Sequence, residues 1–479
     1  MVYLWLGLRK NSAQTSLLLF ALLSYSCSQP APPPKPNSVA IFPVHAVSSG
    51  ESMDWLGRAL TVDLIDAAGA IPGLHVAGPV STLAAATHKE PAAALSVDAL
   101  LRTEIDEKDG LFQFRIQLIR ASDGELIGNH TMARGSEEMI RVHHEIARLM
   151  ARWLGKDAPE LPVKSGTSDL EAHYLYWRGL SERYRPGGNL EVASQFYDRA
   201  VQRDSYFAAA HARLAEAKVA LLRTGRGSSA DVDRARMLAR RAVELGGDSA
   251  SAHAALGAFL LWIDWKWAEA SMELREAIER QPSHAAASQD YAVLLTASRR
   301  FGDAFSQLEA AARIEPLDIA ANQSNQWLRL YARGWSPDQA RAVPGVPVAL
   351  LSAISESYAG NHAKATELAT AVQEQGLRSP VELLHAAQVW RRAGRQDRAG
   401  QLLEKFPGSG PLFHAAAAAL RSSSRDEVIR LIRQAVEVHD PNMVWIHLLP
   451  MFDSLRTDAR FIEIASRIGL TAEEKPASD

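Results

Sequence analysis

The sequence has only one cysteine, Cys27, among its 479 residues. A single thiol excludes an internal disulfide and any metal site that needs several cysteine ligands. The chain also lacks an excess of charge of either sign, because it has 52 basic and 55 acidic residues and a formal net charge of −3. We therefore expect no nucleic-acid partner and no broad electrostatic attraction to an anionic membrane surface.

Motifs of catalysis are lacking as well. The sequence has no Gly-x-Ser-x-Gly elbow and no His-Glu-x-x-His pair, and the Gly-Ser-Gly stretch at residues 408–410 is without the lysine of a phosphate loop. The run His143-His144-Glu145 resembles a fragment of a metal site. Neighbouring residues of a helix point about 100° apart, however, and we interpret this run as a solvated helix face. The sequence therefore predicts a protein that is not an enzyme, with no catalytic residue, no cofactor and no metal.

The first 27 residues contain no apolar run long enough for a typical membrane-spanning helix, which needs about 20 residues. Residues 17–23 form a short apolar core, and Arg9 and Lys10 are the only charged residues before Cys27. This order is typical of an export signal at residues 1–27, and its final cysteine indicates a bacterial lipoprotein that is acylated on Cys27 after cleavage. The match is imperfect, because Ser24 stands where a lipobox usually has leucine, with Leu23 one residue further back.

Two alternatives to lipidation stay open: an uncleaved anchor that includes residues 4–8, and a soluble secreted protein. A lipoprotein would be anchored in the cell envelope and face the periplasm, whereas an uncleaved signal would serve as a single N-terminal membrane anchor. Residues 28–37 are rich in proline and are expected to form an extended, semi-rigid tether between the membrane and the folded part.

Residues 38–155 have the pattern of a small α/β domain. Residues 39–44 form a short apolar run typical of a strand, and residues 53–68 have apolar side chains at helical spacing. Residues 111–119 alternate between apolar and polar side chains, and Asp109-Gly110 before them is a strong hairpin signal. With an amphipathic helix at residues 137–154, the domain is predicted to have four or five strands and two or three helices.

This order of elements resembles the TolB-like amino-terminal domain. The similar stretches are residues 39–44, 56–65, 71–76 and 117–125, whereas residues 80–98 are alanine-rich and depart from the family pattern. The resemblance implies a fold but not an activity. Proteins that join this domain to repeats often begin with a DNA-binding domain, a kinase or a nucleotide cyclase. Only some 37 residues precede the first strand here, and we expect none of those effectors.

A repeat follows the domain. Ala270-x3-Leu274-x2-Ala277-x4-Pro282 recurs 34 residues later, as Ala304-x3-Leu308-x2-Ala311-x4-Pro316. Small residues allow two helices to approach closely, and a 34-residue period of helix pairs is typical of tetratricopeptide repeats. We predict a linker at residues 156–168, with Asp169 as the first helix cap, and an all-α solenoid of about seven or eight pairs at residues 169–440. Prolines 337, 344 and 347 predict irregular later pairs.

The end of the chain is predicted to close this solenoid. Residues 449–461 are similar to a segment that often terminates such arrays, and Phe452, Leu455 and Phe461 would cover the last apolar edge. We therefore expect a cap at residues 441–470 and a disordered tail at residues 471–479. Three tryptophans at positions 262, 265 and 267 are expected to fill a turn between packed helices and not to form a ligand cage.

The first helix of each pair lines the concave face of such a solenoid, and its non-core residues point into the groove. We predict that a protein or peptide partner contacts seven residues there, unless these residues are only solvated: His173, Tyr176, Arg183, Glu216, Gln289, Gln323 and Trp327.

The sequence as a whole predicts an α+β protein, with a small TolB-like α/β domain followed by an all-α tetratricopeptide solenoid. Its expected function is that of a non-enzymatic scaffold of the cell envelope that binds an unknown protein. The alternative is a membrane-anchored signalling or regulatory protein whose effector domain is missing or lies on another chain.

Overall fold

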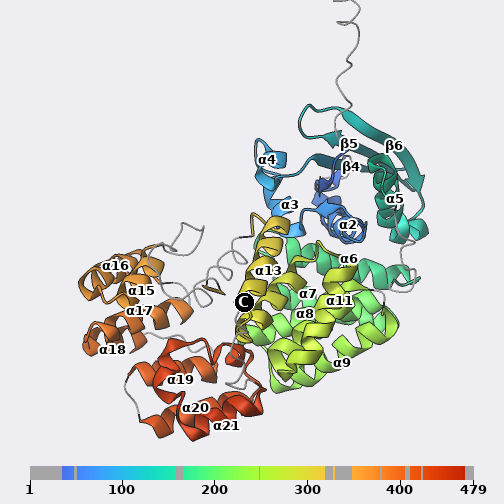
Figure 1. Cartoon of the computed structure of the whole chain (residues 1–479). Coiled ribbons are helices and arrows are strands. Elements are labelled where there is room, and N and C mark those ends of the chain that lie inside the picture. The colour runs from blue at the N-terminus through green and yellow to red at the C-terminus, as the bar shows by residue number, and fades with distance from the viewer. Residues whose placement is uncertain are drawn as a thin grey trace, which may run out of the picture. The chain divides into compact units, whose positions relative to one another are not determined.

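A computed structural model describes residues 35–47, 51–157, 166–247, 249–318, 327–328, 348–377, 380–404, 410–421 and 424–469. Cys27, Gln323, most of the tether and the tail from residue 470 lie outside the described residues. Within the described part of the chain, a mixed sheet precedes a long series of helices, so the predicted α+β class is confirmed (Figure 1). Every described helix falls short of the length or the apolar character that crossing a bilayer requires.

The sheet has the strand order β3-β1-β4-β5-β6, and β2 pairs with β4 outside this path. Strand β1 runs parallel to β3 and β4, and β4, β5 and β6 form an antiparallel meander. The bounds are β1 Ser38–Ile41, β2 His45–Ala46, β3 His75–Val76, β4 Ala99–Lys108, β5 Leu111–Arg120 and β6 Leu126–Arg134.

The β4–β5 hairpin confirms the turn predicted at Asp109-Gly110. Both residues have positive φ, 54° and 75°, which is the conformation that a two-residue hairpin turn requires. Lys108 pairs with Leu111 across the turn, and this register places alternate residues of β5 on opposite faces. Phe114 and Ile116 are accordingly buried, whereas Arg115 between them is exposed.

Helices cover the sheet differently at its two ends. Helices α2 (Glu51–Gly69) and α5 (Val142–Leu154) share one apolar core with the buried face of the sheet. Helices α3 (Pro79–Ala85) and α4 (Pro91–Leu95) bury a smaller cluster on the opposite face, around Ala40 and Leu100. The parallel end is therefore covered on both sides, which is the usual condition for parallel strands.

The remaining helices form hairpins, seven of them within the described residues. They are α6 Leu170–Tyr184 with α7 Leu190–Arg203, α8 Ala208–Arg223 with α9 Ser229–Leu245, α10 Ala250–Phe259 with α11 Trp267–Arg280, α12 Ala285–Ala297 with α13 Phe301–Ile314, α15 Val348–Tyr358 with α16 His362–Gln375, α17 Pro380–Arg392 with α18 Gln396–Glu404, and α19 Pro411–Leu420 with α20 Arg425–Glu437. A short π-helical turn, η3 (Leu260–Asp264), extends α10.

Small residues hold each hairpin together, as the repeat pattern predicts. The three small or apolar repeat residues Ala270, Leu274 and Ala277 of α11 are fully buried, and so are their counterparts on α13. A Cβ atom on Gly179 of α6 would lie 2.4 Å from the ring of Tyr197 on α7, so only glycine permits this approach. The carboxylate of Asp169 accepts a hydrogen bond from the backbone N–H of Ala172 at 2.9 Å, which confirms the predicted cap of α6.

After the last hairpin, the chain forms two 3₁₀ turns, η5 (Pro441–Trp445) and η6 (Pro450–Leu455), and helix α21 (Ala459–Arg467). Phe452, Leu455 and Phe461 of this segment are buried, as predicted. The segment also contacts the third hairpin, which the sequence did not predict. Trp267 donates a hydrogen bond to the carbonyl oxygen of Ile468 at 2.6 Å, and Trp262 packs edge-on against Trp445.

Candidate functional site

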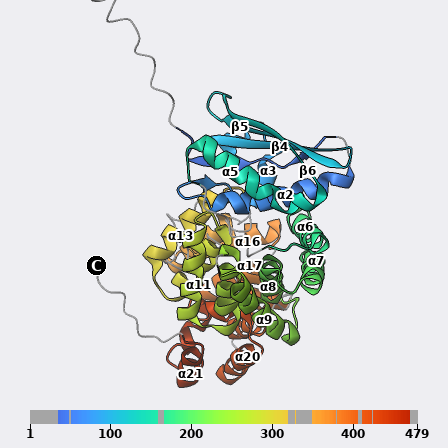
Figure 2. The ribbon, with the colours of Figure 1, turned by 90° about the vertical axis from the view of Figure 1, so that its right-hand side faces the viewer.

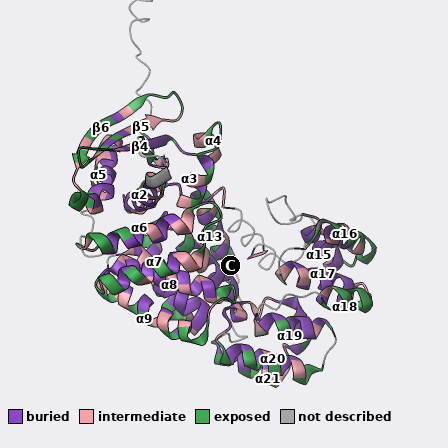
Figure 3. Ribbon diagram, turned by 180° about the vertical axis from the view of Figure 1, so that it is seen from behind, coloured by how far each residue is buried: buried purple, intermediate pink, exposed green. Residues whose placement is uncertain are grey.

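The inner side of the first hairpins is occupied by α2 of the sheet domain. Helix α2 lies between the sheet and α6 in both views (Figures 1 and 2), and it is almost entirely buried, whereas exposed residues gather along α9 and β6 (Figure 3). Two carboxylates of α2, Asp63 and Asp66, are three residues apart and therefore lie on one face of the helix. Both point towards the helical array.

Asp63 is buried and is held by three side chains of α6. The indole nitrogen of Trp177 donates to its Oδ2 at 2.6 Å, the hydroxyl of Tyr176 donates to Oδ1 at 3.4 Å, and Nε2 of His173 lies 3.7 Å from Oδ2. Burial raises the pKa of Asp63, but the contact with His173, the nearby His143 and the Trp177 bond outweigh it and leave the pKa below its usual range. Asp63 is therefore ionised at neutral pH.

Asp66 forms an ion pair with Arg213 of α8, a side chain that is itself buried. Arg213 also reaches Glu216 on its own helix, with 3.1 Å between Nη1 and Oε2. Burial raises the pKa of Asp66, and Arg213 counteracts only part of that rise. A cation between two carboxylates thus joins the sheet domain to the second hairpin.

A third polar contact joins the sheet domain to the fourth hairpin. Glu315, next to the end of α13, accepts hydrogen bonds from the backbone N–H groups of Val80 and Ser81 at 3.1 and 2.7 Å. These two N–H groups belong to the first turn of α3, where they have no partner within the helix. Burial raises the pKa of Glu315 to about 7, against the effect of the same hydrogen bonds.

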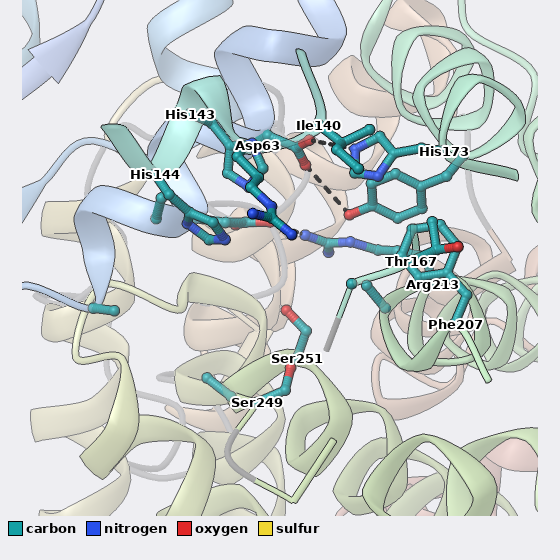
Figure 4. A pocket seen from close by; sticks show the side chains of 18 of the residues that line it. Asp63, Ile140, His143, His144, Thr167, His173, Phe207, Arg213, Ser249 and Ser251 are labelled. Carbon is teal, nitrogen blue, oxygen red and sulfur yellow. Dashed lines mark hydrogen bonds and ion pairs between the residues drawn. The ribbon is translucent and has the colours of Figure 1, made fainter. Parts of the chain in front are cut away.

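Beside Asp63, Asp66 and Arg213 lies a pocket of about 660 Å³. Its walls come from α2, α6, the 3₁₀ turn η1 (Ser136–Arg141) and α5, from residues 166–168, from the N-terminal ends of α8 and α10, and from the C-terminal end of α11. Figure 4 shows His143, His144 and His173 around one part of this space, with Ser249 and Ser251 across it.

Three histidines follow one another along the wall. The rings of His144 and His143 are 4.0 Å apart between centroids, and those of His143 and His173 are 6.4 Å apart. Burial lowers the pKa of His143 to about 3, with His144 and His173 adding to the effect and Asp63 opposing it. His143 is therefore neutral at pH 7. Among the described residues, no group of three or more His, Cys, Asp or Glu side chains is arranged to hold a metal ion.

The interpretation of residues 143–145 as a solvated helix face is therefore wrong for His143, whose exposed fraction is 8%. The Nδ1 atoms of His143 and His144 have no hydrogen-bond partner within the described residues. Helix α5 buries this side because α2 and the first hairpin pack against it, and both partners come from distant parts of the chain. A short-range helical pattern does not contain that information.

The seven residues predicted to line an open groove do not share one surface. His173 and Tyr176 are buried against α2, and Glu216 binds Arg213, close to the half-buried Arg183. Gln289 is half-buried on α12. Trp327 stacks on His385 of α17 with ring centroids 4.8 Å apart, and Gln323 lies outside the described residues. Their role in binding a partner stays a prediction, and for His173 and Tyr176 the sheet domain already occupies the inner side.

Sequence patterns did not single out Asp63, Asp66 or Arg213. The signal that was available is a pair of carboxylates inside an otherwise apolar helix, between Leu60 and Ala67. Charged residues are seldom fully buried unless they are paired, so such a position predicts a buried partner without naming it.

No family model matches the chain, and no curated protein matches it. Similar solved structures include a tetratricopeptide repeat protein from Parabacteroides merdae (11% identity, 59% of this chain and 99% of that chain, TM-score 0.32). Yeast Tom70 (15%, 65% and 70%, TM-score 0.37) and a human IFIT1 dimer with m7Gppp-AAAA (15%, 62% and 69%, TM-score 0.36) are similar too. At these TM-scores, the likeness says nothing about a shared ligand or partner.

Proposed function

We propose that this protein is a non-enzymatic scaffold of the cell envelope, in which a TolB-like domain precedes a tetratricopeptide array that binds a protein or peptide. The observation that carries the proposal is the array itself. Hairpin after hairpin stacks through small buried residues, as in an array that presents a surface to a partner. Extended surfaces of this kind suit the recognition of another chain better than the enclosure of a reaction.

The part of the inner side that remains for a partner lies beyond the second hairpin. Helix α2 covers α6 and pairs with α8, whereas Gln289 on α12 is half-buried and forms no bond to the described part of the sheet domain. We propose that the partner binds around Gln289 of α12 and Trp327. Lipid on Cys27 would hold this surface near a membrane, with the proline-rich segment as the spacer.

A site-specific photo-crosslinking experiment tests the protein-binding part. A photoreactive phenylalanine analogue is placed at Gln289 on the inner helix α12 or, as a matched control, at Met272 on the outer helix α11, which is 70% exposed. The proposal expects a discrete crosslinked protein from position 289 and none from position 272, in cells that express the full chain. Crosslinking from position 272 alone would place the partner on the outer surface.

Membrane fractionation of Cys27→Ala tests the tether separately. A lipoprotein is released from membranes by this change, and mass spectrometry of the wild-type N-terminal peptide shows the added acyl chains. A variant that stays in the membrane at full length indicates the uncleaved anchor. A wild-type protein that is soluble after export indicates simple secretion. Neither of the last two outcomes bears on the array as a binding surface.

A further inference from the structure

We propose that the pocket between the sheet domain and the first hairpins binds a small molecule with a phosphate or carboxylate group, held by Arg141 and Arg148. This site is separate from the protein-binding surface proposed above. Both arginines line the pocket. Arg141 is the last residue of η1 and Arg148 lies within α5, three residues before and four residues after His144, so all three lie on the same side. Neither forms an ion pair or hydrogen bond within the described residues, and both are exposed.

The acidic side chains of the wall do not neutralise these two cations, because each acidic group already has a partner. Glu145 pairs with Arg134 at 2.6 Å, Asp66 pairs with Arg213, and Asp63 is held by α6. The other two guanidinium groups of the wall are paired as well, because Arg213 binds Asp66 and Arg280 lies 2.7 Å from Glu276. The pocket therefore has two uncompensated positive charges, and a guanidinium binds carboxylates and phosphates through paired N–H groups.

Two helix N-termini contribute further donors. Phe207 and Ala209 at the start of α8 line the pocket, and so do residues 249–251 at the start of α10. The first N–H groups of a helix have no acceptor within the helix and carry partial positive charge, so an anion is favoured there. Helix starts alone do not define a site. Here they face the same space as the two arginines.

His143 belongs to the wall of the pocket, and its exposed fraction is 8%. Its Nδ1 atom has no partner among the described residues and is buried within the wall, so the arginines and the helix starts are the groups that a ligand can reach. The volume of about 660 Å³ lies within the range of about 300–1,000 Å³ that small-molecule sites occupy, and it suits an organic anion better than a bare ion.

In the empty pocket burial lowers the pKa of His143 to about 3, so this side chain is neutral near pH 7 and the positive charge of the pocket comes from the arginines. The titratable and charged groups that face this space from all packed elements are Asp63, Asp66, Arg141, His144, Glu145, Arg148, His173, Tyr176, Arg213 and Arg280.

Calorimetric titration of the purified full chain with pyrophosphate, and separately with citrate, tests the proposal and distinguishes phosphate from carboxylate as the preferred group. We expect binding of at least one probe at pH 8, where both probes carry more negative charge than at pH 6 and the two guanidinium groups stay protonated. Arg141→Gln with Arg148→Gln should weaken that binding by about tenfold or more, because each lost charge-assisted contact is worth about 1.5–3 kcal/mol. Both side chains are exposed, so the variant is expected to fold, and its melting curve checks this.

Arg152→Gln is the matched control, because Arg152 is exposed on the same helix α5 and does not line the pocket. Its affinity should stay within about twofold of the wild type, since an exposed charge that does not contact the ligand contributes little. Three results would each overturn the proposal: no heat of binding with either probe up to about 10 mM, binding that the double variant does not weaken, or an equal loss in Arg152→Gln. A loss of affinity with an unchanged melting curve in the double variant supports it.

Discussion

Two of the attachments between the helical array and the non-repeat segments differ in chemistry. The first, here called the polar junction, joins α2 to the first two hairpins through Asp63, Asp66 and Arg213. The second, the aromatic junction, joins the third hairpin to the C-terminal segment through Trp262, Trp265 and Trp267. Each connects residues more than 110 positions apart, for example Asp63 with Trp177 and Trp267 with Ile468.

The difference predicts different responses to change. Apolar contacts at the aromatic junction are non-directional, and each truncation loses stability roughly in proportion to the area exposed. Buried charges at the polar junction contribute little net stability as a complete set, but removal of one partner leaves another buried and uncompensated. The polar junction should therefore fix the position of the sheet domain, and the aromatic junction should mainly add stability.

Truncation after Pro441 should have the largest effect, because it removes Trp445 and Ile468, the C-terminal partners of Trp262 and Trp267. Phe452, Leu455 and Phe461 are each at most 2% exposed, and burial of such a side chain is worth roughly 1.5–3 kcal/mol. Thermal unfolding should begin at a lower temperature, and the exposed face of the last hairpins should cause aggregation visible by size-exclusion chromatography. An unchanged melting curve and a monomeric profile would show that the segment is dispensable for folding.

Arg213→Ala should come next, with a loss of up to about 3 kcal/mol in the free energy of unfolding. Asp66, whose side chain is 29% exposed, loses its cation, and Glu216 keeps only the nearby Arg183. Arg203→Ala is the control, since Arg203 pairs with Asp169 at 2.9 Å but its side chain is 50% exposed. Such an exposed pair is worth at most about 1 kcal/mol. Urea unfolding measures both variants, and equal losses would contradict the distinction between buried and exposed pairs.

The pH dependence should show a smaller effect at Glu315. Its pKa in the folded protein, about 7, lies above the ordinary value of 4.5, so the fold favours the protonated form. The contribution of protonated Glu315 to the stability of the fold is fully present below pH 4.5 and is lost as the pH rises through about 7. From pH 5 to pH 8 the wild type should lose about 2–3 kcal/mol more stability than Glu315→Gln, at about 1.4 kcal/mol per pKa unit. Parallel stability curves for the two proteins would show that Glu315 is ionised throughout.

The smallest effect is expected when tryptophan is replaced by phenylalanine, a change that can be made at both junctions. Trp177 donates to the carboxylate of Asp63 and Trp267 donates to the backbone carbonyl of Ile468, each at 2.6 Å. Loss of a hydrogen bond to a charged group costs about 1.5–3 kcal/mol and loss of a neutral one costs about 0.5–1.5 kcal/mol. Trp177→Phe should therefore destabilise the protein more than Trp267→Phe in denaturant unfolding. The reverse order would mean that the aromatic junction, and not the polar one, depends on directional contacts.

Local features of the fold could be predicted from the sequence because short-range chemistry determines them. Asp169 caps α6, Asp109-Gly110 forms the hairpin turn, and the small residues of the 34-residue repeat are buried. The candidate site could not be predicted, because it depends on packing between segments that are distant in the chain. Nothing near His143 in the sequence indicates that α2 and α6 will cover it, and nothing near Trp262 indicates that Trp445 will reach it.

The Asp66–Arg213 pair also constrains the order in which the chain matures. These residues are 147 positions apart, and a chain made from its N-terminus presents Asp66 long before Arg213 exists. At a synthesis rate of about 5–20 residues per second, Arg213 is made roughly 7–30 s after Asp66. During that interval α2 can pack on the sheet and α5, but its face that carries Asp66 has no partner, so the sheet domain and the first two hairpins should reach their final arrangement in a late step.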